Sequence, residues 1–503
     1  MKKIAIALLV LLLVLVGGAW VAVRVLLAPE RVRAAVEAQV SEALGEQVRI
    51  GSASARIFPA AGLNLNEITI ANTRTRLESV AIETGLRPLF SRRVENAQVT
   101  VSKGHVEIPW LVTLLSSLAQ TPPSTAGSSS GFTVISVRTI ELRDVVLAAG
   151  KHELRVDADG LYQEDRLEVS RLDAKGDGTA FTARGALASV SRVTGLFSID
   201  ADTLNLDALL ALASAASPKD APRAARQTTV QLSIDAAVKA RSGRGATIAF
   251  SDLSTHMRVT PTTVYLAPVS LQSFDGRFTG RVTVDTRSAV PATAIVGDMS
   301  GIDAAALSAF AGSPGAVSGR LAGHASVSCA CVDLQTVRTR MTGTGRFEIV
   351  NGEIPGLHMV RAIVLAFGRP ASDAPKETGE HFSRIAATFT VGGGTIATHD
   401  LAFASPDFDM RGDGTLSTTS GAIDFKADVV LSAELSRQAG TDLVRYAHEG
   451  DRVILPATLS GTLASPRVFI NLQEAIGRAL KNELERRGRA LLDRFLRKKP
   501  GGP

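Results

Sequence analysis

The sequence predicts a mainly β protein that begins with a transmembrane helix, continues as repeated strands with a few short helices, and ends in an amphipathic helix. Three observations predict this class. The 503 residues include 44 glycines and many runs rich in Val, Thr and Ser, which favour strands and turns. A long uncharged apolar stretch stands at the amino terminus, and a basic amphipathic pattern stands at the carboxy terminus.

The first element is an apolar stretch from Ile4 to Val23 without a charged residue. It is long enough to cross a hydrocarbon core of about 30 Å as a helix. A cleaved signal peptide would have a shorter apolar region and a small-residue cleavage site, which we do not find. Lys2 and Lys3 favour a cytoplasmic amino terminus, although three arginines between positions 24 and 33 oppose them. We expect an uncleaved single-pass anchor.

Two low-complexity breaks divide the rest of the chain, at residues 119–131 and 213–226, both rich in Pro, Ser or Ala. With these breaks as linkers, the sequence predicts seven segments. They are a cytoplasmic tip and anchor (1–27), an amino-terminal β region (28–118), a linker (119–131), a β repeat region (132–212), a second linker (213–226), carboxy-terminal β repeats (227–472), and a basic amphipathic helix with its tail (473–503).

The strands between and beyond the linkers repeat. The segments that start at Gly178 and Gly276 share an F-T-x-R strand, then a second strand, then a helix start about 25 residues on. Asp207 and Asp303 occupy matching positions in these helix starts, and a third unit begins at Phe408. This pattern predicts successive meanders of antiparallel strands.

The stretch from Gly345 to Gly368 predicts a strand, a turn at Asn351-Gly352, and a helix. Alternation in this and neighbouring strands predicts one apolar face per hairpin. Such a face belongs either to an ordinary sandwich core or to an open groove, and the two look identical in sequence. Candidate groove residues are Phe347, Ile349, Phe389, Val391, Ile423 and Phe425.

The formal net charge of +6 is located at the carboxy terminus, where residues 476–499 carry nine Lys and Arg against three acidic residues. Aromatic residues make up only 5% of the chain, so few side chains could stack on bases, and we expect no nucleic-acid binding. The same segment predicts a basic amphipathic helix, either a cap on the protein's own end or an interfacial helix on anionic lipid. Its candidate membrane-surface or partner-contacting residues are Leu480, Leu484, Arg486, Arg487 and Phe495.

The two cysteines, Cys329 and Cys331, form a C-x-C pair without His or Cys at zinc spacing. Residues i and i+2 of an extended strand stand too far apart for a disulfide, so pairing needs a local turn. Two free thiols and one small-loop disulfide both stay open as structural outcomes, and neither indicates a metal site.

Catalytic motifs are sparse. A G-x-S-x-G match at residues 127–131 lies in a Pro/Ser/Gly linker instead of a strand-turn-helix elbow. His152 with Glu153 and His448 with Glu449 are interpreted as solvated turn residues, because no nucleophile or orienting group accompanies them. We therefore expect no catalytic residue, no metal and no cofactor.

Several stretches resemble the AsmA family. Residues 31–72 are similar to its amino-terminal signature, a helix and a strand followed by F-P-x-x-G-L-x-L-x-x-[IV]-x-[IL]. Residues 102–115 resemble a strand before a Trp-started helix, with Pro109 where Asn is usual. Residues around 347–360 resemble the carboxy-terminal repeat, with His358 where Asp is common. Residues 452–472 resemble the P-x-x-[LI]-x-G-T-[LI]-x-x-P ending.

This resemblance implies a single-pass protein of the bacterial inner membrane, with a cytoplasmic amino terminus and a periplasmic body. It implies an elongated, bent antiparallel sheet that encloses an apolar groove, related to TamB/YhdP-type lipid-transfer proteins. The implied function is to bind phospholipid acyl chains, and so to contribute to phospholipid transport toward the outer membrane and to envelope integrity. Outer-membrane assembly or lipid-transport proteins are candidate partners.

The alternative is a periplasmic scaffold or assembly factor for outer-membrane proteins, without lipid transfer. A hydrolase would need a carboxylate or Ser/His cluster that the spacing does not reveal.

Overall fold

The computed structural model describes most of the chain between residues 29 and 477. The described ranges are 29–44, 46–56, 61–71, 73–85, 93–111, 133–134, 136–215, 232–288, 290–331, 333–367, 379–438, 448–449 and 452–477. They form two compact units, here called unit 1 (Met1–Pro261) and unit 2 (Thr262–Pro503).

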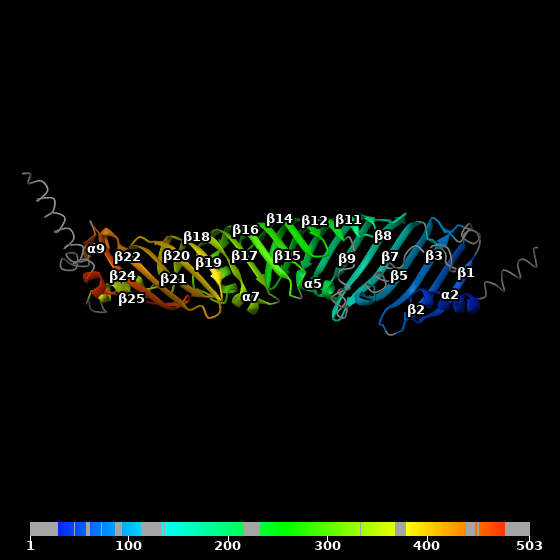
Figure 1. Ribbon diagram of the computed structural model, residues 1–503, viewed down its shortest axis with the longest axis horizontal. Coiled ribbons are helices and arrows are strands. Elements are labelled where there is room, and N and C mark those ends of the chain that lie inside the picture. Colours follow the sequence, from blue (N-terminus) through cyan, green and yellow to red (C-terminus); the bar gives the residue numbers. More distant parts are fainter. Residues whose placement is uncertain are drawn as a thin grey trace, which may run out of the picture. The chain divides into compact units, whose positions relative to one another are not determined.

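Unit 1 contains eleven strands that pair in chain order (Figure 1). They are β1 (Val48–Arg56), β2 (Ala61–Ile70), β3 (Arg76–Thr84), β5 (Ala97–Glu107), β7 (Ser136–Ala149), β8 (His152–Gln163), β9 (Arg166–Gly176), β10 (Thr179–Ser189), β11 (Thr194–Asn205), β12 (Ser233–Gly245) and β13 (Ile248–Val259). Two short strands, β4 (Arg93–Val94) and β6 (Thr133–Val134), pair separately in parallel.

The pairing in unit 1 is mixed, which corrects the prediction of a purely antiparallel sheet. β5 pairs with β7 in parallel, and β11 pairs with β12 in parallel. Parallel neighbours need a connection of a dozen or more residues to return the chain to the same end of the sheet. The connections at these two places contain the predicted linkers 119–131 and 213–226, so the low-complexity breaks mark the places where neighbouring strands run in the same direction.

Unit 2 also contains eleven strands in chain order, and every pairing among them is antiparallel (Figure 1). They are β14 (Thr263–Ser273), β15 (Gly276–Asp285), β16 (Ala292–Asp303), β17 (Arg320–Ala330), β18 (Thr342–Ile354), β19 (Glu380–Gly392), β20 (Thr395–Ala404), β21 (Phe408–Ser417), β22 (Ile423–Leu431), β24 (Arg452–Thr462) and β25 (Ser465–Ile470). The short β23 (His448–Glu449) pairs with β24.

The helices are few and short, as predicted. Those with defined bounds are α2 (Pro29–Leu44), α5 (Leu206–Ala215), α6 (Ala304–Phe310), α7 (Leu334–Arg340), α8 (Met359–Ala366) and α9 (Ala433–Gln438). In unit 1, α2 packs against the core of β1 and β2, and α5 packs against β7, β8 and β12. Each therefore covers part of a sheet face that would otherwise expose apolar side chains.

The predicted repeat has a structural counterpart in strand-strand-helix units, β10-β11-α5 and β15-β16-α6. The matching acidic residues nevertheless differ in role. Asp303 is the N-cap of α6 and accepts hydrogen bonds from the Ala305 and Ala306 amides. Asp207 lies inside α5 and accepts from the Ala246 amide, while Asn205 accepts from Ala208 at the helix start. The two units therefore share the order strand, strand, helix, but different residues cap their helices.

The stretch that predicts a strand, a turn and a helix is β18 followed by α8, but the expected turn at Asn351 is wrong. Asn351 has a φ of 53°, and the pairing of β18 with β19 skips it between Val350 and Gly352. Asn351 lies inside a strand that continues to Ile354, and its conformation fits the tolerance of Asn for positive φ.

Among helices of the described residues, none has the length and apolar character needed to cross a membrane. The predicted anchor, Ile4 to Val23, lies outside the described residues. At the other end the described chain ends with helical residues 472–477, and the rest of the predicted amphipathic helix lies outside the described residues.

Candidate functional site

The strand register places all six candidate groove residues on one face of unit 2. Residues directly opposite in an antiparallel pair, and alternate residues along a strand, share a face. Ile349 of β18 is opposite Ile385 of β19. Phe389 and Val391 follow Ile385 on β19 at even spacing, so they lie on the same face of the sheet. From Val391 the register continues across β20 and β21 to Ile423 of β22. We call this surface the apolar face; Phe347 and Phe425 lie on it by alternation.

The six candidates differ in burial. Ile349, Val391 and Ile423 are buried, with 6–8% of each residue exposed. Phe347, Phe389 and Phe425 are half-buried, and the rings of Phe347 and Phe389 lie 6.3 Å apart. The apolar face is thus neither a sealed core nor a fully exposed surface at these positions.

One end of the apolar face is covered by α8. Met359 and Ile363 of α8 have no exposed surface and belong to the same core cluster as residues of β21, β22 and β24. In that cluster Val429, Leu431 and Leu455 are also 0% exposed. We call this part, from β21 to β25 under α8, the covered end.

The strands β15 to β17 carry the same face in a more open form. Phe278 and Val282 of β15 are opposite Met299 and Ile295 of β16, and Ile295 is opposite Val327 of β17. All five side chains are half-buried. We call this part the open stretch. It offers apolar surface to a ligand, which the covered end does not.

Several phenylalanine rings lie over glycines of the neighbouring strand. A Cβ on Gly345 would lie 2.5 Å from the ring of Phe389, and one on Gly414 would lie equally close to the ring of Phe425. Each of these residues is directly opposite its partner across the strands. The rings therefore fill the space above small residues. Two candidate groove residues thus have a packing role, which the sequence did not indicate.

The opposite face of the same strands is charged. A hollow of about 530 Å³ is lined mostly by residues of this charged face, together with Met299 and Phe347. Arg384 pairs there with Glu348, and Nδ1 of His324 lies 2.9 Å from an Asp298 carboxylate oxygen. Hydrogen bonds from Thr388 hold the pKa of Asp400 below its usual range. The two faces therefore differ sharply in polarity, and only the apolar face suits hydrocarbon.

Sequence reasoning missed one buried acid, Glu380 at the start of β19. It is 7% exposed, and its Oε1 accepts a hydrogen bond of 2.9 Å from the Val360 amide in the first turn of α8. Burial raises the pKa of this carboxyl, and the backbone bonds at the helix start partly offset the rise. Because His358 makes no side-chain cap, Glu380 caps α8 from twenty residues away, beyond the reach of a local motif.

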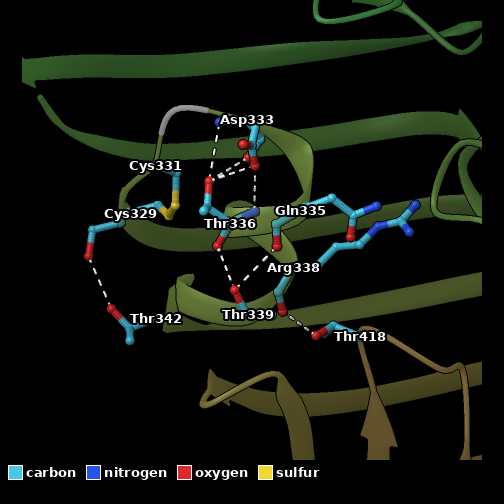
Figure 2. Close-up of a disulfide and its surroundings, with 10 residues drawn as sticks. Cys329, Cys331, Asp333, Gln335, Thr336, Arg338, Thr339, Thr342 and Thr418 are labelled. Atoms are coloured by element: carbon cyan, nitrogen blue, oxygen red, sulfur yellow. Dashed lines mark hydrogen bonds between the residues drawn. A yellow bond between two sulfur atoms is a disulfide. The ribbon is translucent and has the colours of Figure 1, made fainter. Parts of the chain in front are cut away.

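Cys329 and Cys331 are joined by a disulfide, with Cα atoms 5.3 Å apart. The sequence predicts that such a pair can form only where the two cysteines do not both lie in an extended strand. This is so here, because β17 ends at Ala330 and Cys331 follows the strand. Figure 2 shows the disulfide at the base of α7, whose Asp333 cap bonds Thr336 and whose Arg338 carbonyl accepts from Thr418. The pair therefore stands where the chain leaves the sheet for α7.

The two flagged His-Glu pairs lie on strands. The interpretation of His152 and Glu153 as turn residues is wrong, because they begin β8. His152 Nδ1 lies 2.8 Å from an Asp177 carboxylate oxygen, and the Glu153 amide donates to the same carboxylate. His448 and Glu449 form β23. Within the described ranges no group of His, Cys, Asp and Glu is arranged to hold a metal ion.

Two sets of predicted residues lie outside the described part of the chain. They are the G-x-S-x-G match at 127–131 and the tail residues Leu480, Leu484, Arg486, Arg487 and Phe495. The tail's expected role in contacting a membrane or partner therefore stays a prediction.

The family model described as AsmA family matches residues 1–112. This match confirms the AsmA prediction for the amino-terminal region, which includes α2 and the first four strands of the unit 1 sheet. No curated protein and no solved structure matches the chain.

Proposed function

We propose that this protein, with its AsmA-type amino-terminal region, binds lipid acyl chains on the apolar face of unit 2. In this proposal residues 4–23 anchor it in the bacterial inner membrane with the body in the periplasm, and it contributes to phospholipid transport toward the outer membrane and to envelope integrity. The observation that carries the proposal is the register that gathers the apolar candidates on one face, part of which is half-exposed.

The energetic argument concerns hydrocarbon transfer. Each methylene group removed from water contributes about 0.8 kcal/mol, so an acyl chain laid along the open stretch replaces unfavourable contacts of both partners with water. On the charged opposite face an acyl chain would instead remove water from charged groups such as Arg384 and Glu348, which costs free energy. Headgroups stay at the wet border of the apolar face, and no catalytic residue is required.

The test is native mass spectrometry with lipid extraction on the full chain, purified from membranes in mild detergent. We expect bound phospholipid in the wild type and a clear loss in Phe347→Asp, which places a charge on the apolar face. Thr344→Asp is the matched control, because Thr344 lies on the same strand but on the opposite face and is exposed. Equal lipid content in both variants, with both folded, would reject the apolar face as the site.

A scaffold role for outer-membrane protein assembly is the second candidate, and one observation favours it. Phe469 of β25 is 67% exposed, and β25 pairs with β24 at the end of the described strand order of unit 2. Edge strands with exposed aromatic residues are suited to strand addition. Phe469→Ser separates the candidates: it should leave phospholipid content unchanged under the lipid-binding proposal and impair outer-membrane protein assembly under the scaffold proposal.

A further inference from the structure

A segment between β16 and β17 crosses the apolar face of unit 2. We call residues 304–319 the strap; it contains α6 and a following loop. Its two ends meet, since the Ala304 amide donates to the Gly319 carbonyl at 3.0 Å. The Ser318 amide donates to the Glu353 carbonyl at 2.9 Å, which fixes the exit of the strap beside the end of β18. A loop of this length with paired ends is an Ω-loop.

The tip of the strap reaches the opposite rim of the sheet. That rim carries α7, which connects β17 to β18, and the turn from β21 to β22. Arg338 Nη2 of α7 donates to the Ala311 carbonyl at 3.4 Å. The Ser313 hydroxyl lies 3.4 Å from where a Cβ on Gly421 would stand. The strap therefore spans from one rim to the other.

The strap is held by few large buried side chains, although its Phe310 ring lies 5.7 Å from the ring of Phe274. Its buried residues, Ala304, Ser308 and Ala316, are small and offer little apolar area, and Leu307 and Val317 are only partly buried against the main core. The bond from Arg338 is long, which makes it weak. By contrast, α8 covers the same face with Met359 and Ile363, both 0% exposed.

The connections to the strap permit movement. Gly301 just before it has a φ of 67°, and Gly319 at its end has a φ of 123°. Lids commonly move about a few such loop or element-terminal positions. A Cβ on Gly319 would lie 2.9 Å from the Ile349 side chain, so the strap's exit directly overlies a candidate groove residue.

We propose that the strap is a lid over the apolar face, latched at its tip by Arg338, and that its displacement exposes Leu321 and Ile349 to an acyl chain. The identity of the ligand rests on the proposed function, whereas the movement of the lid does not. In the closed form these two residues are 9% and 7% exposed, and Leu307 and Val317 of the strap pack against the core cluster that contains them. Displacement of the strap would therefore open part of their surface to hydrocarbon.

Hydrogen exchange on the full chain in mild detergent tests the movement without any lipid. We expect the Ser318 amide, which bonds the Glu353 carbonyl of β18 in the closed form, to exchange at least about tenfold faster than the amides within β17 and β18. Exchange of the strap as slow as that of β17 would overturn the lid, whatever the lipid content of the protein.

Variants of the latch sharpen this test. Arg338→Ala should raise the exchange rate of the strap about threefold or more and leave β17 unchanged, because the Thr418 bond to the Arg338 carbonyl is retained. Arg338→Lys should restore part of the protection. Arg340→Ala, an exposed position on the same helix, is the matched control. No change in Arg338→Ala, or the same change in Arg340→Ala, would reject Arg338 as the latch.

Photolabelling tests the consequence for ligand access, with a C16 fatty acid that carries a diazirine on its chain as the probe. Arg338→Ala should increase labelling of β17 and β18 relative to wild type, while labelling of the open stretch on β15 stays constant. Labelling of β15 without any increase at β17 and β18 would retain the proposed function and reject the lid. Absence of labelling on all of these strands, with rapid strap exchange, would retain the movement and reject acyl-chain binding.

Discussion

The covered end and the open stretch of unit 2 belong to one apolar face, yet one is a core and the other a surface. Val429 in the covered end is 0% exposed, whereas Val282 in the open stretch is half-buried. Both lie on antiparallel strands with alternating side chains. The difference comes from the helices over the covered end. Met359 and Ile363 of α8 belong to its core cluster, and so does Leu435 of α9, which packs against β22 and β24.

This difference teaches that alternation defines which side chains share a face, and that the elements connecting the strands decide what the face becomes. In unit 2 the β18–β19 connection contains α8, whereas the strap occupies the β16–β17 connection with smaller side chains. A ligand-binding surface and a core can therefore be built from equivalent strands. Changes to the covering elements should convert one into the other.

The largest effect on stability is expected when the packing of α8 on the covered end is weakened. Ile363→Ala removes a fully buried side chain at the centre of the contact between α8 and the sheet. Substitutions of this kind cost about 2–5 kcal/mol, because they lose hydrophobic contact and leave a cavity. We expect lower stability in chemical denaturation and stronger binding of an apolar fluorescent dye to the folded protein. Leu365→Ala, on the exposed side of the same helix, is the control and should change little.

The same substitution at the two valines compares the regions directly. Val429→Ala should reduce the free energy of unfolding by about 2 kcal/mol, since two methyl groups leave a tightly packed site. Val282→Ala should cost less than about 1 kcal/mol, because its side chain is only half-buried and its site can relax. Denaturant titrations of both variants measure the difference. Equal losses would mean that the open stretch is packed as a core.

The sequence allowed some of this organisation to be predicted, for identifiable reasons. Alternation placed Phe347 and Phe389 on one apolar face, because the side-chain period of a strand is two and depends only on local residues. The low-complexity linkers were recognised, but their effect on strand direction was not, because pairing partners are not encoded in linker composition. The turn expected at Asn351 failed because Asn accepts positive φ within a strand as well as in a turn.

Other features of the site depend on contacts between distant residues. Glu380 caps α8 across twenty positions, and the tip of the strap meets Gly421 about a hundred residues downstream. The position of Phe389 over Gly345 follows from the register of β18 with β19, which the sequence alone does not set. Such contacts require the fold, since no local pattern of residue types distinguishes them.

The phenylalanine and glycine pairs provide a third test of how the apolar face is built. Gly345→Ala should reduce stability by about 1–3 kcal/mol, because the new Cβ would lie 2.5 Å from the Phe389 ring and 2.6 Å from the His324 carbonyl oxygen. Gly392→Ala is the control, since a Cβ there would meet nothing within 4 Å. A thermal melt compares them. If both variants have the same melting temperature, the packing of the Phe389 ring does not require a glycine at position 345.

The smallest expected effect concerns the pH dependence of the covered end through Glu380. Burial raises the pKa of its carboxyl above the ordinary value of 4.5, with Asp407 raising it further and His358 lowering it. The folded state therefore holds the proton to higher pH than the unfolded state, so this group's contribution to stability falls as pH rises from about 4.5 through the folded pKa.

Glu380→Gln removes this titration but keeps an oxygen that can accept from the Val360 amide. Denaturant titrations from pH 4 to 7 should show the wild type losing stability relative to Glu380→Gln as pH rises, by about 1 kcal/mol or less. A difference that stays constant with pH, or that grows in the wild type's favour, would mean that Glu380 is charged throughout and that the cap on α8 is an ordinary ionised one.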